Sequence, residues 1–335
     1  MRARYASVFC CLAASILCSA PGAQAEPKEI RVAQQFGVNY LPLLVMKKYQ
    51  LIEKQAEKAG LGAVKVSWTQ FGSGSAMNDA LLASNLDFAS GGVGPLLKIW
   101  DKAKGQFDVK GAASLGSMPM YLSTVNPAVK SVKDFTAKDK IALPAVKVSI
   151  QAIVLQMASA RAFGDAQFDK LDGLTVSMKH PDAMAALLSR TTEVTAHFAN
   201  SPFQEQELQT AGVHRVLSSY DLLGPSTLNS LYTTAKFHDS SPRAYAAVLA
   251  ALKQAMEIIN RDKKNAAEVY VAEERSKLTP EFVQKILADP NFVVTSTPQG
   301  IMKYAEFMHR VKAMRNMPAS WKDVYFAEIH GESGS

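Results

Sequence analysis

Short apolar runs alternate with amphipathic stretches along the chain, and loops of glycine, serine or proline separate them. The run at residues 29–34 predicts a strand with Ile30 and Val32 on its apolar side. Residues 43–48 predict a helix that follows Pro42. Further strands are expected at residues 64–69, 86–89, 140–143, 174–178, 194–198 and 215–218, with helices at 76–83, 150–163, 182–189 and 203–210. This alternation predicts parallel sheets covered by helices.

The C-terminal part of the chain has a helical pattern, with helices expected at residues 241–259, 279–287 and 297–314. Two α/β sections and a helical tail predict two lobes with a cleft between them, because a chain of this length is too long for one typical core. In open α/β sheets, ligands bind beyond the carboxyl ends of the strands. The loops that follow the strands are therefore the expected site.

The first 25 residues have the pattern of a cleaved signal peptide. Arg2 and Arg4 precede an apolar run at residues 6–20, and a small-x-small motif ends at Ala25, so cleavage is expected before Glu26. The alternative is a membrane anchor, but the run is shorter than the roughly 20 residues that span a bilayer. All three cysteines lie in this segment. The mature protein is therefore expected to be exported and soluble, without thiols or disulfides.

Composition and motifs favour binding over catalysis. The formal charge of +7 falls by two when Arg2 and Arg4 leave, and the basic residues are spread along the chain, so nucleic acid is not an expected partner. The six histidines are scattered without metal-ligand spacing, and no nucleophile elbow or P-loop is present. Residues 72–74 begin like a dinucleotide fingerprint, but Met77 replaces its third glycine. We predict no enzyme activity, cofactor or metal.

Two loops of small residues stand where helices are predicted to begin. Residues 72–75 offer bare backbone amides and two hydroxyls, and Ser149, two residues after Lys147, offers a similar arrangement in the second half. A helix N-terminus carries partial positive charge and unpaired N–H groups, which suit an anionic or carbonyl group. The alternative interpretation of each serine is plain helix capping.

Several segments together resemble the nitrate/sulfonate/taurine type of ABC-transporter substrate-binding proteins, which are related to the thiamine-pyrimidine-binding group. They are residues 40–53, the glycine-rich loop at 72–75, Asp87 to Pro95, residues 132–143, residues 192–202 and the C-terminal 321–325. The sequence departs from the family pattern at Gln50, where glycine is usual, at Thr195, where aspartate is usual, and in the 132–143 segment, which lacks a glycine.

The resemblance implies an α/β, two-lobed periplasmic binding protein fold of type II, with a ligand cleft between lobes joined by two crossovers. Lobe one is expected at residues 26–117 and 222–335, and lobe two at 118–221. The implied function is that of a periplasmic, monomeric solute-binding protein, which closes on a small molecule and presents it to an ABC permease in the inner membrane. The alternatives are a ligand sensor that docks on a receptor, or a thiamine-pyrimidine-synthase-like enzyme, against which the lack of cysteine in the mature chain argues.

The expected ligand-binding residues come from loops of both lobes. They are Gln35, Phe36, Asn39, Tyr40, Gly72, Ser73, Gly74, Ser75, Gly92 and Val93 in lobe one, and Met118, Ser149, Asn200 and Phe203 in lobe two. Lys147 is the only basic residue near a candidate loop, and the alternative is that it points into solvent. The substrate stays open among nitrate, a sulfonate, a carboxylate and a pyrimidine.

Overall fold

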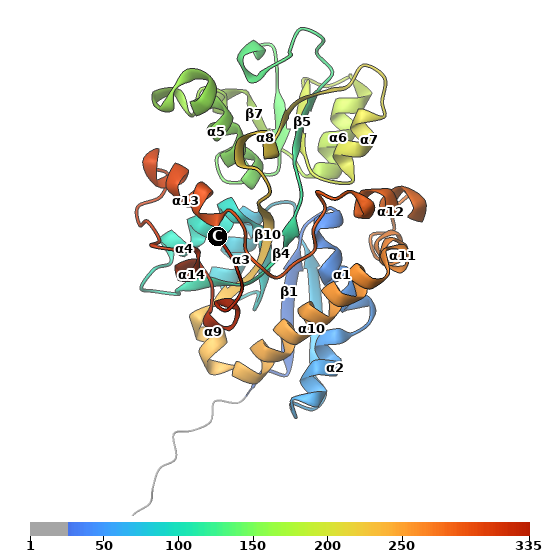
Figure 1. Cartoon of the computed structure of the whole chain (residues 1–335), viewed down its shortest axis with the longest axis vertical. Helices are drawn as coiled ribbons and strands as arrows, with labels where there is room; N and C mark the ends of the chain where they lie inside the picture. Colours follow the sequence, from blue (N-terminus) through green and yellow to red (C-terminus); the bar gives the residue numbers. More distant parts are fainter. Residues whose placement is uncertain (1–25) are drawn as a thin grey trace, which may run out of the picture.

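The computed structural model describes residues 26–335, so the predicted signal peptide lies outside the described residues. Two α/β lobes stack along the long axis of the molecule (Figure 1). We call lobe one the part built around strands from residues 29–117 and 227–234, and lobe two the part built around strands from residues 121–218. None of the helices within residues 26–335 combines the length and apolar character that crossing a membrane requires.

Lobe one contains five strands in two hydrogen-bonded groups. β1 (Glu29–Gln34) pairs in parallel with β2 (Lys65–Gln70). β10 (Thr227–Thr234) runs antiparallel between β3 (Ala89–Gly92) and β4 (Val109–Ser117). An isolated parallel bridge between Val32 and Phe88 joins the two groups. The helices are α1 (Leu41–Lys48), α2 (Leu51–Lys58), α3 (Gly74–Leu82), α4 (Val93–Lys102), α9 (Ala235–Ser240), α10 (Pro242–Arg261), α11 (Lys263–Glu273), α12 (Pro280–Ala288), α13 (Ile301–Arg310) and α14 (Trp321–Val324).

Lobe two is one mixed five-stranded sheet. Its strand order is β7 (Thr175–Ser177), β6 (Ile141–Leu143), β8 (Ala196–Ala199), β5 (Tyr121–Thr124) and β9 (His214–Ser218). β6 is parallel to both neighbours, whereas β5 is antiparallel to β8 and β9. The helices are α5 (Ile150–Phe163), α6 (His180–Ser189), α7 (Phe203–Leu208) and α8 (Tyr220–Leu223). Short 3-10 turns complete the chain at Val38–Tyr40, Val132–Asp134, Asp165–Gln167, Asp172–Leu174 and Ala327–Ile329.

The prediction of parallel sheets holds for β1 with β2 and for β6 with its two neighbours, but three strands absent from the sequence-based assignment, β4, β5 and β10, run antiparallel to their neighbours. β4 leads into β5 of the other lobe, and β9 leads back into β10, so the chain crosses between the lobes twice. An α/β fold with two crossovers is therefore confirmed. The third strand begins at Ala89, three residues later than predicted, since residues 86–88 instead approach β1. The residue boundaries given above for the two lobes stay a prediction.

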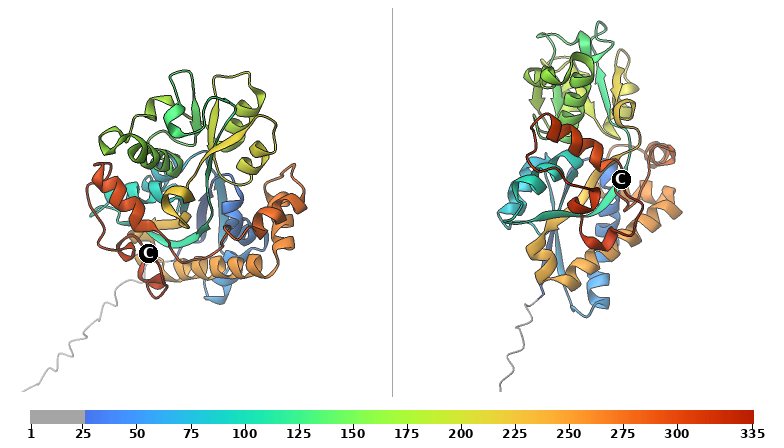
Figure 2. Two further views of the ribbon diagram at one scale, coloured as in Figure 1. Left: turned by 45° about the horizontal axis from the view of Figure 1, so that its top comes forward. Right: turned by 60° about the vertical axis from the view of Figure 1, so that its left-hand side comes forward.

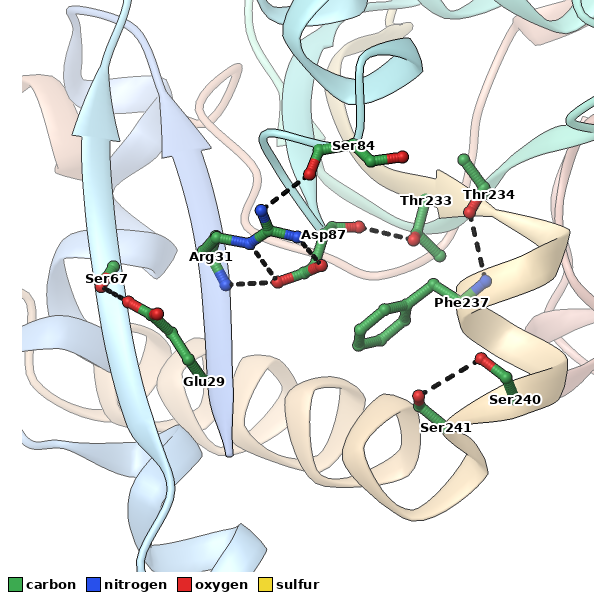
Figure 3. A network of polar contacts seen from close by, with 10 residues as sticks. All are labelled: Glu29, Arg31, Ser67, Ser84, Asp87, Thr233, Thr234, Phe237, Ser240 and Ser241. Carbon is green, nitrogen blue, oxygen red and sulfur yellow. Dashed lines mark hydrogen bonds and ion pairs between the residues drawn. The ribbon is translucent and has the colours of Figure 1, made fainter. Parts of the chain in front are cut away.

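Asp87, the first residue of the family-like segment 87–95, connects two strands of lobe one through hydrogen bonds (Figure 3). Its carboxylate accepts hydrogen bonds from the backbone N–H, Nε and Nη2 of Arg31 at 2.8, 3.0 and 2.7 Å, and its backbone carbonyl accepts one from Thr233 Oγ1. These bonds tie β1 and β10 to the chain just before β3, so they position β3, which leads directly into α4. The carboxylate also raises the pKa of the Arg31 guanidinium. Asp87 is therefore a structural residue here.

The C-terminal helices contact both lobes. α13 packs against α4 of lobe one and α5 of lobe two, and Figure 2 shows it beside the junction of the lobes.

Gln50, where the family usually has glycine, adopts φ 50°, in the left-handed region that glycine occupies without strain. The sequence departure thus falls at a turn between α1 and α2, away from the cleft.

Candidate functional site

A cavity of about 20 Å³ lies between the lobes. Its lobe-one wall consists of Gln35, Phe36, Tyr40, Gly74, Gly92, Pro95 and Asn229, and its lobe-two wall of Pro144, Ser149, Ile150, Gln151, His180 and Asn200. A space of this size holds about one water-sized molecule. The described conformation is thus one in which the lobes are closed.

Direct contacts hold the lobes together around the cavity. The backbone N–H of Val38 donates to the carbonyl of Ser201 at 2.9 Å, and Asn200 Nδ2 donates to Asn39 Oδ1 at 2.8 Å. Gly92 lies so close to lobe two that a Cβ added there would be 2.6 Å from the Cβ of Ile150. Since Gly92 has φ −59°, the glycine is required by this close approach and not by its backbone conformation.

Four helices begin at the cavity. Gly74 is the first residue of α3, Gly92 is the N-cap of α4, Ser149 and Ile150 begin α5, and His180 is the first residue of α6. Two of these helices belong to each lobe. The first N–H groups of a helix have no acceptor within it, and the end carries about half a positive charge. Their convergence makes the cavity electropositive, although no Asp, Glu, Lys or Arg within residues 26–335 lines it.

Amide side chains supply further polar atoms. Asn229 and Asn200 are each 3% exposed, and the Nδ2 of Asn229 and the Oδ1 of Asn200 have no hydrogen-bond partner within residues 26–335. A buried polar atom without a partner costs free energy, so these atoms favour a ligand that pairs with them. Gln35 Nε2 donates to Tyr40 Oη at 2.8 Å, and burial raises the pKa of Tyr40 well above its ordinary value. Tyr40 therefore stays a protonated phenol.

His180 is the titratable group on the lobe-two wall. Its Nε2 lies 3.2 Å from the amide nitrogen of Gln151, and its Nδ1 lies 2.9 Å from Nε2 of His197. Phe203 stacks beneath the ring, with centroids 5.5 Å apart. Burial, and secondly the neighbouring His197, lower the pKa of His180 well below its ordinary value. The imidazole is therefore neutral at neutral pH.

The cation that the sequence suggested does not line the cavity. Lys147 is exposed and does not line the cavity. Another cation, Lys179, lies beside a cavity residue, with Nζ 6.0 Å from the ring centroid of Phe36 and 3.5 Å from Asp182 Oδ2. Within residues 26–335, no three His, Cys, Asp or Glu side chains form a group that could hold a metal ion.

Half of the residues expected from sequence line the cavity together. They are Gln35, Phe36, Tyr40, Gly74, Gly92, Ser149 and Asn200. The hydroxyls of Ser73 and Ser149 both accept from the backbone of their own helices, from Ala76 and Ala152, so both serines are helix caps.

The other seven expected residues lie around the cavity without lining it. Asn39 bonds to Asn200, Ser73 and Ser75 stand at the start of α3, and Val93 is buried at the start of α4. Gly72 is exposed, Phe203 stacks on His180, and Met118 lines two other hollows, of about 210 and 10 Å³, together with Phe292.

Six cavity residues were missed from the sequence: Pro95, Pro144, Ile150, Gln151, His180 and Asn229. Asn229 lies on β10, a strand that the pattern did not indicate, and no sequence signal places it. A signal for His180 existed, because Pro181 is the second residue of α6 and proline favours the first helical turn. The predicted helix began two residues too late, and the histidine was left in a loop.

The family follows from the sequence of most of the chain. Residues 23–272 match the model of the NMT1-like family. The chain belongs to this family. This confirms the resemblance that the ordered motifs indicated. No curated protein matches the chain in sequence.

Solved structures of binding proteins share the fold. The alkanesulfonate-binding protein SsuA from Xanthomonas axonopodis pv. citri, bound to MOPS, is 18% identical, with a TM-score of 0.70 over 90% of this chain and 99% of that chain. The periplasmic aliphatic sulphonate binding protein SsuA from Escherichia coli is 18% identical, with a TM-score of 0.62 over 90% and 92%. The periplasmic nitrate-binding protein NrtA from Synechocystis PCC 6803 is 14% identical, with a TM-score of 0.65 over 89% and 84%. The two-lobed fold of periplasmic binding proteins, expected from the sequence, is thereby confirmed.

Proposed function

We propose that this protein is the periplasmic solute-binding component of an ABC importer, and that it captures a small anion by closing its lobes. The observation that carries the proposal is the convergence of four helix N-termini, two from each lobe, on one cavity without a carboxylate in its wall. The similar structures include proteins whose names state that they bind alkanesulfonate and nitrate, and both ligands are anions. We infer that this family member binds its ligand without transforming it.

Closure and binding are coupled because the groups are divided between the lobes. α3 and α4 come from lobe one, and α5 and α6 from lobe two, so an anion meets all four ends only when the lobes are closed. A ligand shifts a conformational equilibrium only by its difference in affinity for the two states. This division supplies that difference, and the closed form is the one that a permease would recognise.

The surroundings of Phe36 favour an organic anion over an inorganic one. The cavity is too small for an apolar tail, but a groove of about 320 Å³ shares Phe36 with it and includes Met184, Phe203 and Leu278. Because Phe36 lines both spaces, rotation of its ring would join them. An apolar tail in the groove would then extend from a sulfonate or carboxylate headgroup in the cavity, while Lys179 lies near the junction.

The proposal is tested by thermal unfolding of the protein, refolded from denaturant to remove bound ligand, with a panel of anions. The panel contains nitrate, acetate, methanesulfonate, hexanesulfonate and MOPS. A ligand at 100 times its Kd adds roughly 2.7 kcal/mol to stability, which shifts the midpoint by several degrees. We expect the largest shift with an anion that carries an apolar tail. A protein that no member of the panel stabilises would contradict the proposal.

Gly92→Ala separates cleft closure from general stability. The added Cβ would lie 2.6 Å from that of Ile150 in the other lobe, so closure is blocked while each lobe stays intact. We expect the apparent affinity for the ligand to fall at least tenfold in Gly92→Ala. The unfolding midpoint of the ligand-free protein should change little. Gly173→Ala is the matched control, because nothing lies within 4 Å of its added Cβ. Equal ligand shifts in the two variants would show that the ligand is not held between the lobes.

A further inference from the structure

A buried chain of hydrogen-bonding side chains runs from the interior of lobe two to the cavity. Glu207 Oε1 lies 2.5 Å from His197 Nδ1, His197 Nε2 lies 2.9 Å from His180 Nδ1, and His180 Nε2 faces Gln151. Each residue comes from a different element: α7, β8, α6 and α5. We call the three hydrogen-bonded residues Glu207, His197 and His180 the relay. It ends on a ring nitrogen at the cavity wall.

The inner end of the relay is sealed from water. The side chains of Glu207 and His197 are both 0% exposed, and the second oxygen of Glu207, Oε2, has no partner within residues 26–335. Other charged groups on the packed elements are accounted for elsewhere. Lys179 and Asp182 pair with each other at the surface of α6, Glu205 on α7 accepts from Ser201 and Gln204, and Tyr40 faces the cavity from lobe one as a phenol.

Burial decides how many protons the inner pair holds. An unpaired carboxylate in the interior is far costlier than a neutral arrangement, so Glu207 and His197 together favour net neutrality. Two descriptions have this proton count: a carboxylate beside an imidazolium, or a carboxylic acid beside a neutral ring whose proton lies on Nε2. In both, His197 Nε2 carries a hydrogen and donates to His180 Nδ1. His180 then has its Nδ1 occupied as an acceptor.

The proton count of the inner pair determines which nitrogen of His180 carries the proton. Because burial and His197 lower the pKa of His180, its ring holds one proton, and that proton must be on Nε2. The amide of Gln151 is 3.2 Å away and can rotate by 180°, so it can accept from the ring or join it as a second donor toward a ligand. The cavity wall therefore presents a neutral N–H donor at His180.

We propose that His180 is a ligand-contacting donor of the anion site, and that the buried Glu207–His197 pair makes it one by fixing its proton on Nε2. This inference rests on the proposed function, because an anion is the ligand that the donor would select. Loss of one proton from the relay leaves a buried net negative charge and turns His180 Nε2 into an acceptor. Anion binding is therefore linked to one proton held by the relay.

The linkage predicts a pH dependence with a defined sign. Anion affinity is highest when the relay is in its net-neutral state, and it falls with rising pH, by up to about tenfold per pH unit, where that state loses its proton. Glu207→Gln removes the linkage, because the glutamine amide can rotate to accept from or donate to His197 Nδ1 at constant charge. Either tautomer of His180 then becomes available without gain or loss of a proton. We expect Glu207→Gln to bind with an affinity that does not change with pH.

The experiment is isothermal titration of nitrate, methanesulfonate and hexanesulfonate into the wild type, Glu207→Gln and Glu205→Gln between pH 6 and 9. Glu205→Gln is the matched control, since this carboxylate lies on the same helix but bonds to Ser201 and Gln204 and not to the relay. We expect a falling affinity in the wild type and the control, and a flat profile in Glu207→Gln. The same pH profile in the wild type and Glu207→Gln would overturn the inference.

Nitrogen-15 spectra of histidine-labelled protein give a second readout that does not depend on affinity. With bound anion, wild-type His180 should show the Nε2-protonated neutral tautomer, and the Nδ1-protonated tautomer in the complex would overturn the inference. If none of the three anions binds to the wild type at any pH, both this inference and the proposed function fail. Binding with a pH-independent affinity in the wild type defeats this inference alone.

Discussion

Two histidines, one in each lobe, show how differently the same side chain is used. His180 in lobe two is 5% exposed and its ring contacts Gln151, His197 and Phe203. His238 on α9 of lobe one lies between two carboxylates, with Nδ1 2.6 Å from Asp239 and Nε2 2.9 Å from Glu328, and its ring stacks 4.2 Å from that of Phe326. Both rings thus have both nitrogens engaged and an aromatic face covered.

The pKa values of the two histidines move in opposite directions. Burial and His197 lower the pKa of His180, whereas at His238 the hydrogen bonds with Asp239 and Glu328 outweigh burial and raise the pKa. This difference shows that a carboxylate affects a nearby histidine through the number of protons that the two groups hold together, as well as through the distance between them. Asp239 and Glu328 are exposed and each contacts one nitrogen of the ring directly, which stabilises an imidazolium. Glu207 is one ring further from His180 and is sealed from water, so it directs a proton and adds no charge to the ring.

The largest effect that separates the two regions is expected from removal of the carboxylates. Glu207→Ala leaves buried His197 without its acceptor, and loss of one member of a buried pair should lower the free energy of unfolding by about 3 kcal/mol. Glu328→Ala should cost less than about 1 kcal/mol, because the pair is at the surface and His238 keeps Asp239. Urea unfolding at pH 7 measures both. Equal losses would mean that burial does not distinguish the two sites.

An intermediate effect is expected in the acid dependence of stability. The folded pKa of His180 is depressed, so below about pH 6.5 the unfolded chain binds a proton that the folded protein does not. Wild-type stability should therefore fall with decreasing pH, with up to about 1.4 kcal/mol per pH unit from this residue. His180→Gln should lose that component while keeping an amide at the cavity. Urea unfolding from pH 7.5 to 5 checks it, and parallel curves for the two proteins would contradict the assignment.

The smallest effect, of opposite sign, is expected from His238→Gln. The folded pKa of His238 is raised, so its stabilising contribution is fully present below about pH 6.5 and is lost as the pH rises through the folded value. The wild type should exceed the variant by well under 1 kcal/mol, because Asp239 and Glu328 are solvent-screened. The difference should be larger at pH 6 than at pH 8. A difference that grows as the pH rises would show that the two carboxylates do not hold the proton.

The sequence predicted local structure well where one element carried its own signals. α5 begins and ends as predicted, with Ser149 as its N-cap, and β1 has its predicted bounds. β4, β5 and β10 were missed, because they have no regular alternation and are largely buried, so periodicity does not reveal them. That omission removed Asn229 from the expected site and hid the antiparallel pairing of β4 with β10, the two strands at which the chain leaves and re-enters lobe one.

The site was predicted to the same extent. The glycine and serine loops named the helix starts, so Gly74, Gly92 and Ser149 were found at the cavity. His180 and His197 were dismissed as scattered histidines, since a separation of 17 residues across two elements has no metal-ligand or catalytic pattern. Lys147 is near the candidate loop in sequence but does not line the cavity, while Lys179 lies beside Phe36 of the cavity wall.

The order of motifs along the chain determined the family, the α/β class and the positions of most helix starts, because each depends on neighbouring residues. Only the tertiary structure decided that four of those helix starts meet and that Gly92 lies too close to Ile150 for a side chain. It also decided that His180 is hydrogen-bonded to the buried pair of His197 and Glu207. The physical reason is that these properties depend on residues of both lobes meeting across the cleft, and on the exclusion of water from the interior of lobe two. No local pattern of residues encodes how far a side chain lies from solvent or from a partner on another strand.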